Sequence, residues 1–451
     1  MAFHGRRPSD IAVIGSGISG MAAAWLLSQR HRVTVYERED RLGGHTNTVD
    51  VPSPAGPAPV DTGFIVYNER NYPNLTALFR HLEVPTKASD MSFSVSLDGG
   101  ALEYAGNNLG TLFAQPRNLL RPRFWAMLRD LLRFYRTAPY LLDDPGHEGL
   151  TLGAYLDRQG YSRAFIEDHL LPMAAAIWSS PARAMRDHPA VSFVRFCQNH
   201  GLLSLGNRPP WRTVEGGSRE YVRRLTSAYA ERVRLDCGVR RLRRASDHVL
   251  VEDGAGRIAR HDHAVVACHA DEALAMLDDP DPEEIGLLGA FRYERNLAVL
   301  HSDPGLMPLR RAVWSSWNYL GERRPESEQG LCVTYWMNRL QSIPESTPYF
   351  MTLNPHRSPL QGSIQASFLY DHPMFNAEAA KAQRRLWTLQ GRRNTWFCGA
   401  YFGAGFHEDG LQAGLAVAEA LGGVRRPWRV AEESGRIHLG PERARPLEAA
   451  S

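Results

Sequence analysis

The stretch Asp10-Ile11-Ala12-Val13-Ile14-Gly15-Ser16-Gly17-Ile18-Ser19-Gly20 decides the fold of this chain. Residues 10–14 predict a buried strand, residues 21–28 a helix, and residues 32–36 a second strand that ends on Glu37. A strand, a glycine-rich turn, a helix and a second strand, in this order and spacing, are typical of a dinucleotide-binding βαβ unit. The sequence therefore predicts an α/β protein with a Rossmann-like domain.

The glycines of this motif have separate tasks. Gly15 permits the tight turn, Gly17 lets a pyrophosphate approach the backbone, and Gly20 lets the helix pack closely on the strand. The helix N-terminus supplies amide donors and the positive end of a dipole. Glu37 is placed to accept hydrogen bonds from an adenosine ribose, and the remaining cofactor contacts predicted here are Ser16, Ser19 and Arg38. The motif alone does not distinguish NAD from FAD.

A second glycine signature follows in Arg41-Leu42-Gly43-Gly44-His45-Thr46-Asn47-Thr48. A glycine pair six and seven residues beyond the ribose carboxylate resembles the second signature of the flavin amine oxidase superfamily. That superfamily includes amine oxidases, protoporphyrinogen oxidase and the phytoene desaturases. The resemblance implies FAD, with further contacts from Arg41, Gly43, Gly44, His45 and Thr46. The alternatives are an ordinary Gly-Gly loop and, for Arg41, a surface salt bridge.

The end of the chain carries a matching pattern. Residues 394–400 predict a strand that ends at a glycine, and Gly405-Phe406-His407-Glu408-Asp409-Gly410 precedes a helix over 411–421. This resembles the superfamily's C-terminal flavin motif and implies cofactor contacts from Gly399, Glu408, Gly410 and Leu411. Helix capping is the alternative role for Glu408 and Asp409. Residues 213–218 and a strand over 233–242 resemble the re-entry into the FAD domain, which implies a contact from Val239.

These matches imply a discontinuous FAD-binding domain over 9–70, 210–285 and 390–424. The intervening segments 71–209 and 286–389 would form an inserted α+β substrate domain of mixed sheet and helices. Strand-like runs at 331–336 and 363–370 fit this domain. We expect residues 425–451 to be a flexible tail.

The composition indicates an intracellular enzyme. A net charge of +3 is too small to indicate nucleic-acid binding. The five cysteines are scattered and predict free thiols in a reducing compartment. No signal-peptide pattern or membrane span is present, and the histidines lack HxxxH or HExxH spacing, so we expect no metal site. We expect a cytoplasmic protein that could also bind peripherally to the inner face of the cell membrane.

That peripheral location rests on one segment. In a helix over 124–136, Phe124, Leu128, Leu131, Leu132 and Tyr135 share one face, and the opposite face carries arginines, with more just upstream. Such a helix over 117–136 could lie on an anionic membrane surface and would indicate a lipidic substrate. The alternative is a helix that packs its apolar face into the substrate domain. The arginines are Arg117, Arg121, Arg123, Arg129, Arg133 and Arg136.

The residues weaken the default inference of amine oxidation. The resemblance implies a lysine in the later half of the substrate domain, but the chain has only Lys87 and Lys381. Phe406 stands where amine oxidases often have a tyrosine. An apolar C–H substrate fits these departures better, with His45 and His407 as catalytic candidates that could relay a proton. Structural hydrogen bonding is the alternative role for both histidines. The predicted substrate-binding residues are Tyr67, Tyr335, Trp336 and Phe406, with core packing as the alternative for the first three.

A narrower resemblance points to lipids. The runs Leu42–Thr48, Asp61–Asn68, Met337–Gln341 and Gly405–Gly410 are similar to a bacterial branch of amine-oxidase-like proteins associated with cyclopropane-synthase-type lipid methyltransferases. This implies a desaturase of unsaturated or methylated fatty acyl chains, with a lipid methyltransferase as a partner. The alternatives are a flavin amine oxidase that releases hydrogen peroxide and a non-catalytic flavoprotein partner of a lipid-modifying enzyme.

Overall fold

The structure, a computed structural model, describes residues 7–54, 56–143, 149–204, 206, 208–323, 332–422 and 424–440. Its first layer is a five-stranded parallel sheet in the order β10-β2-β1-β14-β20. The first two strands in the chain have the predicted bounds, and the sheet draws strands from all three segments assigned to the FAD-binding domain. Its strands are β1 (Asp10–Ile14), β2 (Arg32–Tyr36), β10 (Val233–Arg234), β14 (His263–Val266) and β20 (Thr395–Phe397).

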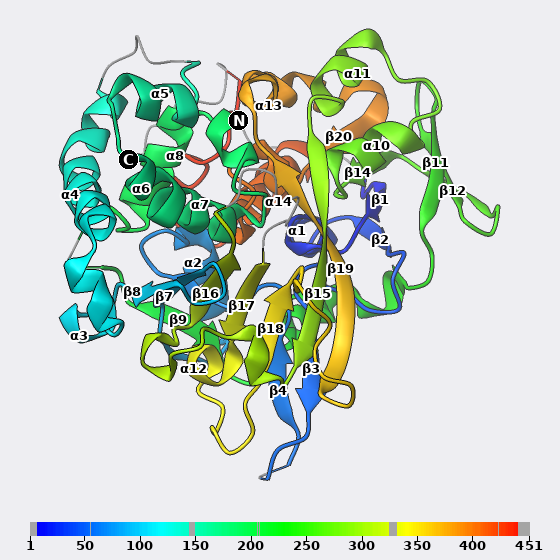
Figure 1. Cartoon of the computed structure of the whole chain (residues 1–451). Helices are drawn as coiled ribbons and strands as arrows, with labels where there is room; N and C mark the ends of the chain where they lie inside the picture. The colour runs from blue at the N-terminus through cyan, green and yellow to red at the C-terminus, as the bar shows by residue number, and fades with distance from the viewer. Residues whose placement is uncertain are drawn as a thin grey trace.

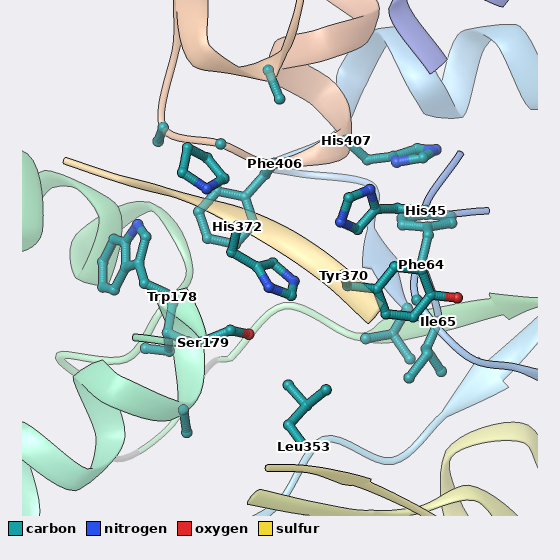
Figure 2. A pocket seen from close by; sticks show the side chains of 18 of the residues that line it. His45, Phe64, Ile65, Trp178, Ser179, Leu353, Tyr370, His372, Phe406 and His407 are labelled. Atoms are coloured by element: carbon teal, nitrogen blue, oxygen red, sulfur yellow. The ribbon is translucent and has the colours of Figure 1, made fainter. Parts of the chain in front are cut away.

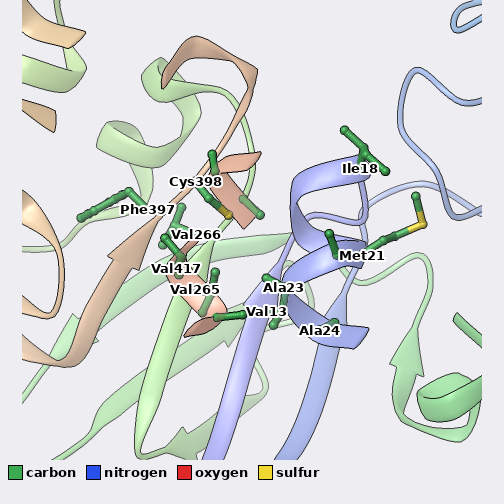
Figure 3. Close-up of a cluster of buried hydrophobic side chains, with 14 of the residues drawn as sticks. Val13, Ile18, Met21, Ala23, Ala24, Val265, Val266, Phe397, Cys398 and Val417 are labelled. Atoms are coloured by element: carbon green, nitrogen blue, oxygen red, sulfur yellow. The ribbon is translucent and has the colours of Figure 1, made fainter. Parts of the chain in front are cut away.

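Two helices cover one side of this sheet by packing against each other. They are α1 (Ile18–Ser28) and α14 (His407–Gly422), and both are rich in alanine and glycine. A Cβ on Gly414 would lie 2.1 Å from the carbonyl oxygen of Ser19, so the two helices approach more closely than a larger residue would allow. Figure 3 shows Ala23 of α1 and Val417 of α14 beside the valines of the sheet. This packing fixes the start of both helices at the edge of the sheet.

The second layer is a seven-stranded mixed sheet in the order β19-β15-β18-β17-β16-β7-β8. The long strands β15 and β19 run down the centre of Figure 1, with the parallel sheet on one side and helices α4–α8 on the other. All seven strands come from the two segments assigned to the substrate domain. They are β7 (Phe93–Leu97), β8 (Leu102–Ala105), β15 (Arg292–His301), β16 (Trp317–Gly321), β17 (Cys332–Trp336), β18 (Phe350–Leu353) and β19 (Ile364–Met374).

Three small sheets and the remaining helices complete the described part of the molecule. The small sheets pair β3 (Thr48–Val51) with β4 (Ala58–Asp61), β9 (Trp211–Val214) with β5 (Tyr67–Asn68) and β6 (Thr86–Ser89), and β12 (Val249–Asp253) with β11 (Val239–Arg244) and β13 (Ile258–His261). The other α-helices are α2 (Pro73–His81), α3 (Leu109–Leu112), α4 (Pro122–Thr137), α5 (Leu152–Arg158), α6 (Arg163–Phe165), α7 (Leu171–Trp178), α8 (Ala190–Asn199), α9 (Arg219–Thr226), α10 (Ala270–Met276), α11 (Pro282–Leu288), α12 (Met337–Gln341) and α13 (Ala377–Gln383). The predicted α/β fold with an inserted α+β region is confirmed.

Two predicted elements are different in the structure. The single strand over 233–242 is two strands, because the chain leaves the parallel sheet after Arg234 and starts a separate antiparallel sheet at Val239. The prediction of a flexible tail is wrong for residues 425–440. Arg426 is buried there and its guanidinium pairs with Glu419, while Ile437 joins the main core. Residues 441–451 and Leu331 lie outside the described residues.

The predicted faces of the 124–136 helix also need correction. The buried face of α4 is formed by Phe124, Met127, Asp130 and Phe134. Asp130 was not expected there. Its carboxylate accepts a hydrogen bond from the backbone N–H of Ser162 at 2.7 Å, which compensates for its burial. The predicted apolar face therefore shares only Phe124 with the buried face, and its other residues lie beside that face.

Candidate functional site

One large cavity, of about 1980 Å³, extends from the carboxyl ends of the parallel strands to the helices of the substrate domain. Ligands of open α/β sheets bind at this end of the strands. The cavity is lined near the first sheet by the loop Gly15–Ser19, and farther away by β19, α4 and α7. It therefore joins a predicted cofactor site to a predicted substrate site.

The glycine loop at the start of α1 has the form of a phosphate cradle. Gly15 has a φ of +96°, and a Cβ there would lie 2.9 Å from the carbonyl oxygen of Ala267. In contrast, a Cβ on Gly17 would meet nothing within 4 Å, because this part of the loop borders the cavity. Gly17 is the N-cap of α1 and offers no side-chain cap. The first amide groups of the helix are thus available to an anion such as a pyrophosphate.

Glu37 connects the end of β2 to this cradle. Its carboxylate accepts hydrogen bonds from the backbone N–H and hydroxyl of Ser16 and, at 3.0 Å, from the backbone N–H of Glu39. Glu37 also lines the cavity, as do Ser16, Ser19 and Arg38, and Arg38 forms an ion pair with Glu272. A carboxylate at this position fits a ribose that donates two hydroxyl groups.

The second glycine pair lies directly against the first motif. A Cβ on Gly44, which has a φ of +57°, would be 3.2 Å from the Cα of Gly17, so the second loop favours glycine where it approaches the first. Arg41 donates hydrogen bonds to the carbonyls of Gly44 at 2.9 Å and of Thr46 at 3.3 Å, which supports this loop from the cavity side. Gly43, Gly44, Val239 and Gly399 all line the cavity. These features fit the pyrophosphate, ribose and ring system of FAD.

Five residues predicted to contact the cofactor do not line the cavity. Gly20 and Gly410 are packing positions, since a Cβ would lie 2.0 Å from the carbonyl oxygen of Gly15 and 2.9 Å from Ile18, respectively. Thr46 bonds to the hydroxyl of Tyr221, and Leu411 is in the main core. Glu408 accepts hydrogen bonds from the backbone of Asn74 and Leu75, so its carboxylate connects α14 to α2 instead of facing the cofactor.

His45 lies inside the cavity among other rings. It stacks on Tyr370 with ring centroids 5.0 Å apart, and the ring of His372 lies 5.3 Å away. Figure 2 shows these three rings projecting into the same space. Burial, and then the neighbouring His372, hold the pKa of His45 well below its usual value, so the imidazole is neutral at physiological pH.

His407 lines the cavity at the start of α14, but one of its ring nitrogens already has a partner. Nε2 lies 2.6 Å from the hydroxyl of Tyr221, and the ring stacks on Phe64 at 3.9 Å. Burial lowers the pKa of His407 to about 3. These contacts are those of a neutral histidine that holds the wall of the site, and its predicted catalytic role stays a prediction.

The substrate side of the cavity is mostly aromatic and aliphatic. Tyr335 and Phe406 line it as predicted. Phe406 stacks on Phe196 and contacts Trp178, while Leu353 forms the opposite wall (Figure 2). Tyr67 and Trp336 were predicted to line the cavity, and they do not. Tyr67 packs edge-on against Phe79 in the main core, and Trp336 packs with its three neighbours Met307, Trp314 and Phe350.

The helix α4 contributes one wall of this cavity. Leu128, Leu131, Leu132 and Tyr135 line it, as does Arg129. Arg129 therefore lies beside the leucines rather than on the face opposite to them. The other arginines of the segment mostly contact protein: Arg117 and Arg121 donate to the carbonyl of Ala101, Arg123 pairs with Asp168, and Arg133 lies over the ring of Tyr161.

Several cavity residues were not predicted from the sequence. They include Phe64, Trp178, Ser179, Leu353, Tyr370 and His372. One signal was present: Phe368, Tyr370 and His372 alternate in a strand-like run, and residues two apart in a strand share one face. Ser179 has a left-handed backbone, with a φ of +51°, at the end of α7, which places its side chain in the cavity.

The described residues contain neither a side-chain cluster suited to a metal ion nor a helix suited to cross a membrane. No group of three or more His, Cys, Asp or Glu side chains there could hold a metal ion. Within the same residues, none of the helices has the length and apolar character needed to cross a bilayer.

Comparison with known proteins agrees with this geometry. A curated relative, the carotenoid phi-ring synthase of Streptomyces griseus, is 34% identical over 181 residues, which cover 36% of this chain and 33% of the relative. The chain thus spans about a third of the length of that relative. Two solved structures show the same fold: a CLA-producing fatty acid isomerase from P. acnes (TM-score 0.64, 16% identity, 92% of this chain and 97% of that one) and cyclohexylamine oxidase from Brevibacterium oxydans (TM-score 0.64, 17% identity, 92% and 99%).

The family assignment comes from the sequence itself. Residues 18–302, more than half of the chain, match the family described as flavin containing amine oxidoreductase. The matched region includes helix α1, the second glycine pair and three strands of the parallel sheet, β2, β10 and β14. The chain therefore belongs to the flavin-containing amine oxidoreductase family and is an FAD-dependent oxidoreductase.

Proposed function

We propose that this enzyme desaturates fatty acyl chains of membrane lipids, including chains that are unsaturated or already methylated. One observation carries the proposal: the wall contributed by residues 91–211 contains no carboxylate among its described lining residues. Its charged members are Arg129 and Arg208, and the rest are mainly apolar or aromatic. A cationic amine would have no counter-ion along this wall, whereas an acyl chain would bury apolar surface against it.

The residues of this wall can hold such a chain and exclude water. FAD, when bound, accepts the hydride that a desaturation removes from carbon. The second hydrogen of the new double bond leaves as a proton, and the electrons pass on to an acceptor such as dioxygen or a quinone. His45 is neutral and reaches the cavity, so it is our candidate to take that proton or to pass it to water.

The neighbouring folds are compatible with this substrate class. The fatty acid isomerase from P. acnes shows that the same fold accommodates a fatty acid substrate. The sequence relative is named for its action on a carotenoid. A methylated acyl substrate would be the product of a lipid methyltransferase, which we propose as a functional partner acting before this enzyme.

Entry of lipid is best explained from the surface around α3 and α4. Leu109, Trp125 and Leu132 line the cavity and are also 74%, 50% and 46% exposed, so apolar surface continues from the cavity to the outside. Leu119 and Leu120 extend this surface, and the exposed Arg129 and Arg136 flank it. We propose that this region, at one edge of the molecule in Figure 1, rests on an anionic phospholipid bilayer.

Amine oxidation is the second candidate, because the family is named for it. The two lysines do not support it. Lys87 lies in β6 and Lys381 in α13, and neither lines the cavity. The fold itself accommodates amine oxidation, as cyclohexylamine oxidase demonstrates.

The deciding experiment is anaerobic reduction of the flavin in purified holoprotein. The holoprotein is mixed with liposomes of unsaturated or methylated phospholipid, and separately with a panel of amines, while the flavin absorbance is followed. We expect bleaching by lipid alone, with acyl chains lighter by two hydrogens in mass spectrometry. Bleaching by an amine, with unchanged lipid, would establish amine oxidation instead.

A further inference from the structure

His372 is tied to the buried Asn296 on the neighbouring strand. In the antiparallel pair of β15 and β19, Asn296 is opposite Tyr370 and Glu294 is opposite His372. Asn296 and His372 are therefore diagonal neighbours on the same face of the sheet, within reach of each other. The side-chain Nδ2 of Asn296 lies 3.0 Å from Nδ1 of His372.

The orientation of the Asn296 amide is set by its other partners. Nδ2 donates to the carbonyl oxygen of Glu294 at 3.0 Å, and Oδ1 accepts from Nδ2 of Asn354 at 2.6 Å. The Oδ1 of Asn354 in turn accepts from the backbone N–H of Leu297 at 2.8 Å, which fixes the orientation of Asn354 as well. A flipped Asn296 would place its oxygen against the carbonyl of Glu294. The group that faces His372 is therefore an N–H donor.

A donor at Nδ1 decides which ring nitrogen carries the proton. Nδ1 must be the acceptor, so in the neutral imidazole the hydrogen is on Nε2. The described residues give Nε2 no partner, and His372 lines the cavity with its ring in the open space of Figure 2. We propose that His372 is a fixed hydrogen-bond donor at Nε2, positioned by Asn296, for an oxygen or nitrogen acceptor of the ligand bound in this cavity.

The surroundings keep this histidine neutral. His45 is 5.3 Å away, and His269 and Asp371 are its other titratable neighbours. Burial, with a smaller contribution from His269, lowers the pKa of His372 to about 4, while Asp371 acts in the opposite direction. A fixed neutral donor at this point of the cavity would define where the polar atom of a ligand lies. This inference concerns the residues alone, so it holds for a lipid or an amine substrate.

The acceptor can belong to either of two ligands. A carbonyl or carboxylate oxygen of the substrate has the required lone pairs, and so does the ring system of the flavin. The two sources separate in a titration of protein labelled with ¹⁵N-histidine, since the chemical shift of Nε2 responds to a new hydrogen bond. FAD added to the apoprotein tests the flavin, and oleate added to the holoprotein tests the substrate oxygen.

The tautomer itself is tested by NMR of the same labelled holoprotein. The His372 signals are assigned by their loss in His372→Gln, and we expect the proton on Nε2. In Asn296→Asp, a carboxylate would accept from Nδ1–H, so we expect the proton to move to Nδ1 and the pKa of His372 to rise. Asn296→Ala removes the donor and should give a mixture of tautomers, which keeps the test valid if Asn296→Asp does not fold.

Any of three results would overturn the inference. One is an Nδ1-protonated His372 in the wild-type protein, and another is a tautomer that is the same in the wild type and both Asn296 variants. The third is an Nε2 shift that neither FAD nor oleate changes. Thermal unfolding and the flavin spectrum of each variant show whether its cavity is intact.

Discussion

Nε of Arg436 lies 2.6 Å from the fully buried carboxylate of Asp409, and this ion pair fastens the segment after α14 to the start of that helix. Arg436 also donates to the carbonyl of Asn71 at 2.9 Å, so it joins α14 to the residues before α2. A sequence rich in arginine and proline after residue 424 gave no indication of this. The segment over 424–440 is thus part of the support beneath the cofactor site.

Removal of the arginine should destabilise the protein. In Arg436→Ala the carboxylate of Asp409 is left buried without its counter-ion, and we expect a loss of about 3 kcal/mol in the free energy of unfolding. Urea unfolding of the holoprotein measures this loss. Arg429→Ala, an exposed arginine of the same segment, is the matched control and should have almost no effect. Equal stability of the two variants would contradict the role of the ion pair.

The two glycines Gly17 and Gly20 should respond differently to alanine. Gly17 has a φ of −62° and open space at its Cβ position, so Gly17→Ala should fold normally but place a methyl group where the pyrophosphate binds. We expect at least about tenfold weaker FAD binding, about 1.4 kcal/mol, with unchanged stability of the apoprotein. Fluorescence titration with FAD and thermal unfolding of the apoprotein measure the two effects.

Gly20→Ala is the contrasting variant. Its new Cβ would lie 2.0 Å from the carbonyl oxygen of Gly15, so the helix and loop must separate. We expect this apoprotein to lose about 3 kcal/mol of stability in addition to FAD affinity. If Gly17→Ala destabilised the apoprotein as much as Gly20→Ala does, the loop around Gly17 would not be an open cradle.

The sequence predicted those parts of the molecule whose local pattern and final contacts coincide. The βαβ unit is encoded within residues 10–37, and each glycine has a steric reason that can be read from its spacing. Glu408 shows the limit of this approach. Its place in a flavin-like motif suggested a cofactor contact, but Asn74 and Leu75, more than 300 residues away in the chain, supply its partners. His372 was missed for the same reason, because its role depends on Asn296 of another strand.

The cavity wall formed by α4 was partly predictable from the sequence. Apolar periodicity placed Leu128, Leu132 and Tyr135 together, and they do share a cavity wall. The periodicity could not indicate that the core side of α4 includes Met127 and Asp130. Asp130 can be buried there because its carboxylate accepts a hydrogen bond from the backbone of Ser162, which comes later in the chain. A helix that borders both a core and a cavity has two inward sides, and one periodicity does not separate them.

Asp61 should make stability depend on pH. It is fully buried beneath the second glycine loop, where it accepts hydrogen bonds from Ser218, Thr48 and Gln341, and burial raises its pKa from 3.8 to about 6. Because the folded pKa is higher than the unfolded one, its contribution to stability is fully present below pH 3.8. That contribution is lost as the pH rises through 6. The shift corresponds to about 3 kcal/mol.

Asp61→Asn isolates this contribution, because an amide does not ionise. The free energy of unfolding of the wild type minus that of the variant should fall by about 2.4 kcal/mol between pH 4 and pH 7. Urea unfolding of both proteins across this range gives the difference at each pH. A difference that does not change with pH would mean that Asp61 keeps the same protonation state in the folded and unfolded chain.

Leu119 and Leu120 should control binding to membranes. They are 49% and 86% exposed on the short helix Pro116–Leu120, next to the mouth of the cavity, but they do not line it. Exposed leucines beside arginines are stabilised by insertion into the interface of an anionic bilayer. Replacing both with glutamate removes apolar area and adds repulsion from the lipid phosphates. We expect at least about tenfold weaker binding to phosphatidylglycerol vesicles, because each buried leucine contributes about 2 kcal/mol.

The matched control is Leu360→Glu, since Leu360 is 61% exposed on the loop between β18 and β19. Sedimentation with vesicles compares the three proteins, and oxidation of a detergent-dispersed acyl substrate reports on the active site. The Leu119/Leu120 variant should lose vesicle binding and activity on vesicles but keep activity in detergent, because its cavity wall is unchanged. Unchanged vesicle binding in this variant, or the same loss in Leu360→Glu, would contradict lipid entry at α3 and α4 while leaving the chemistry of the cavity to be decided by flavin reduction.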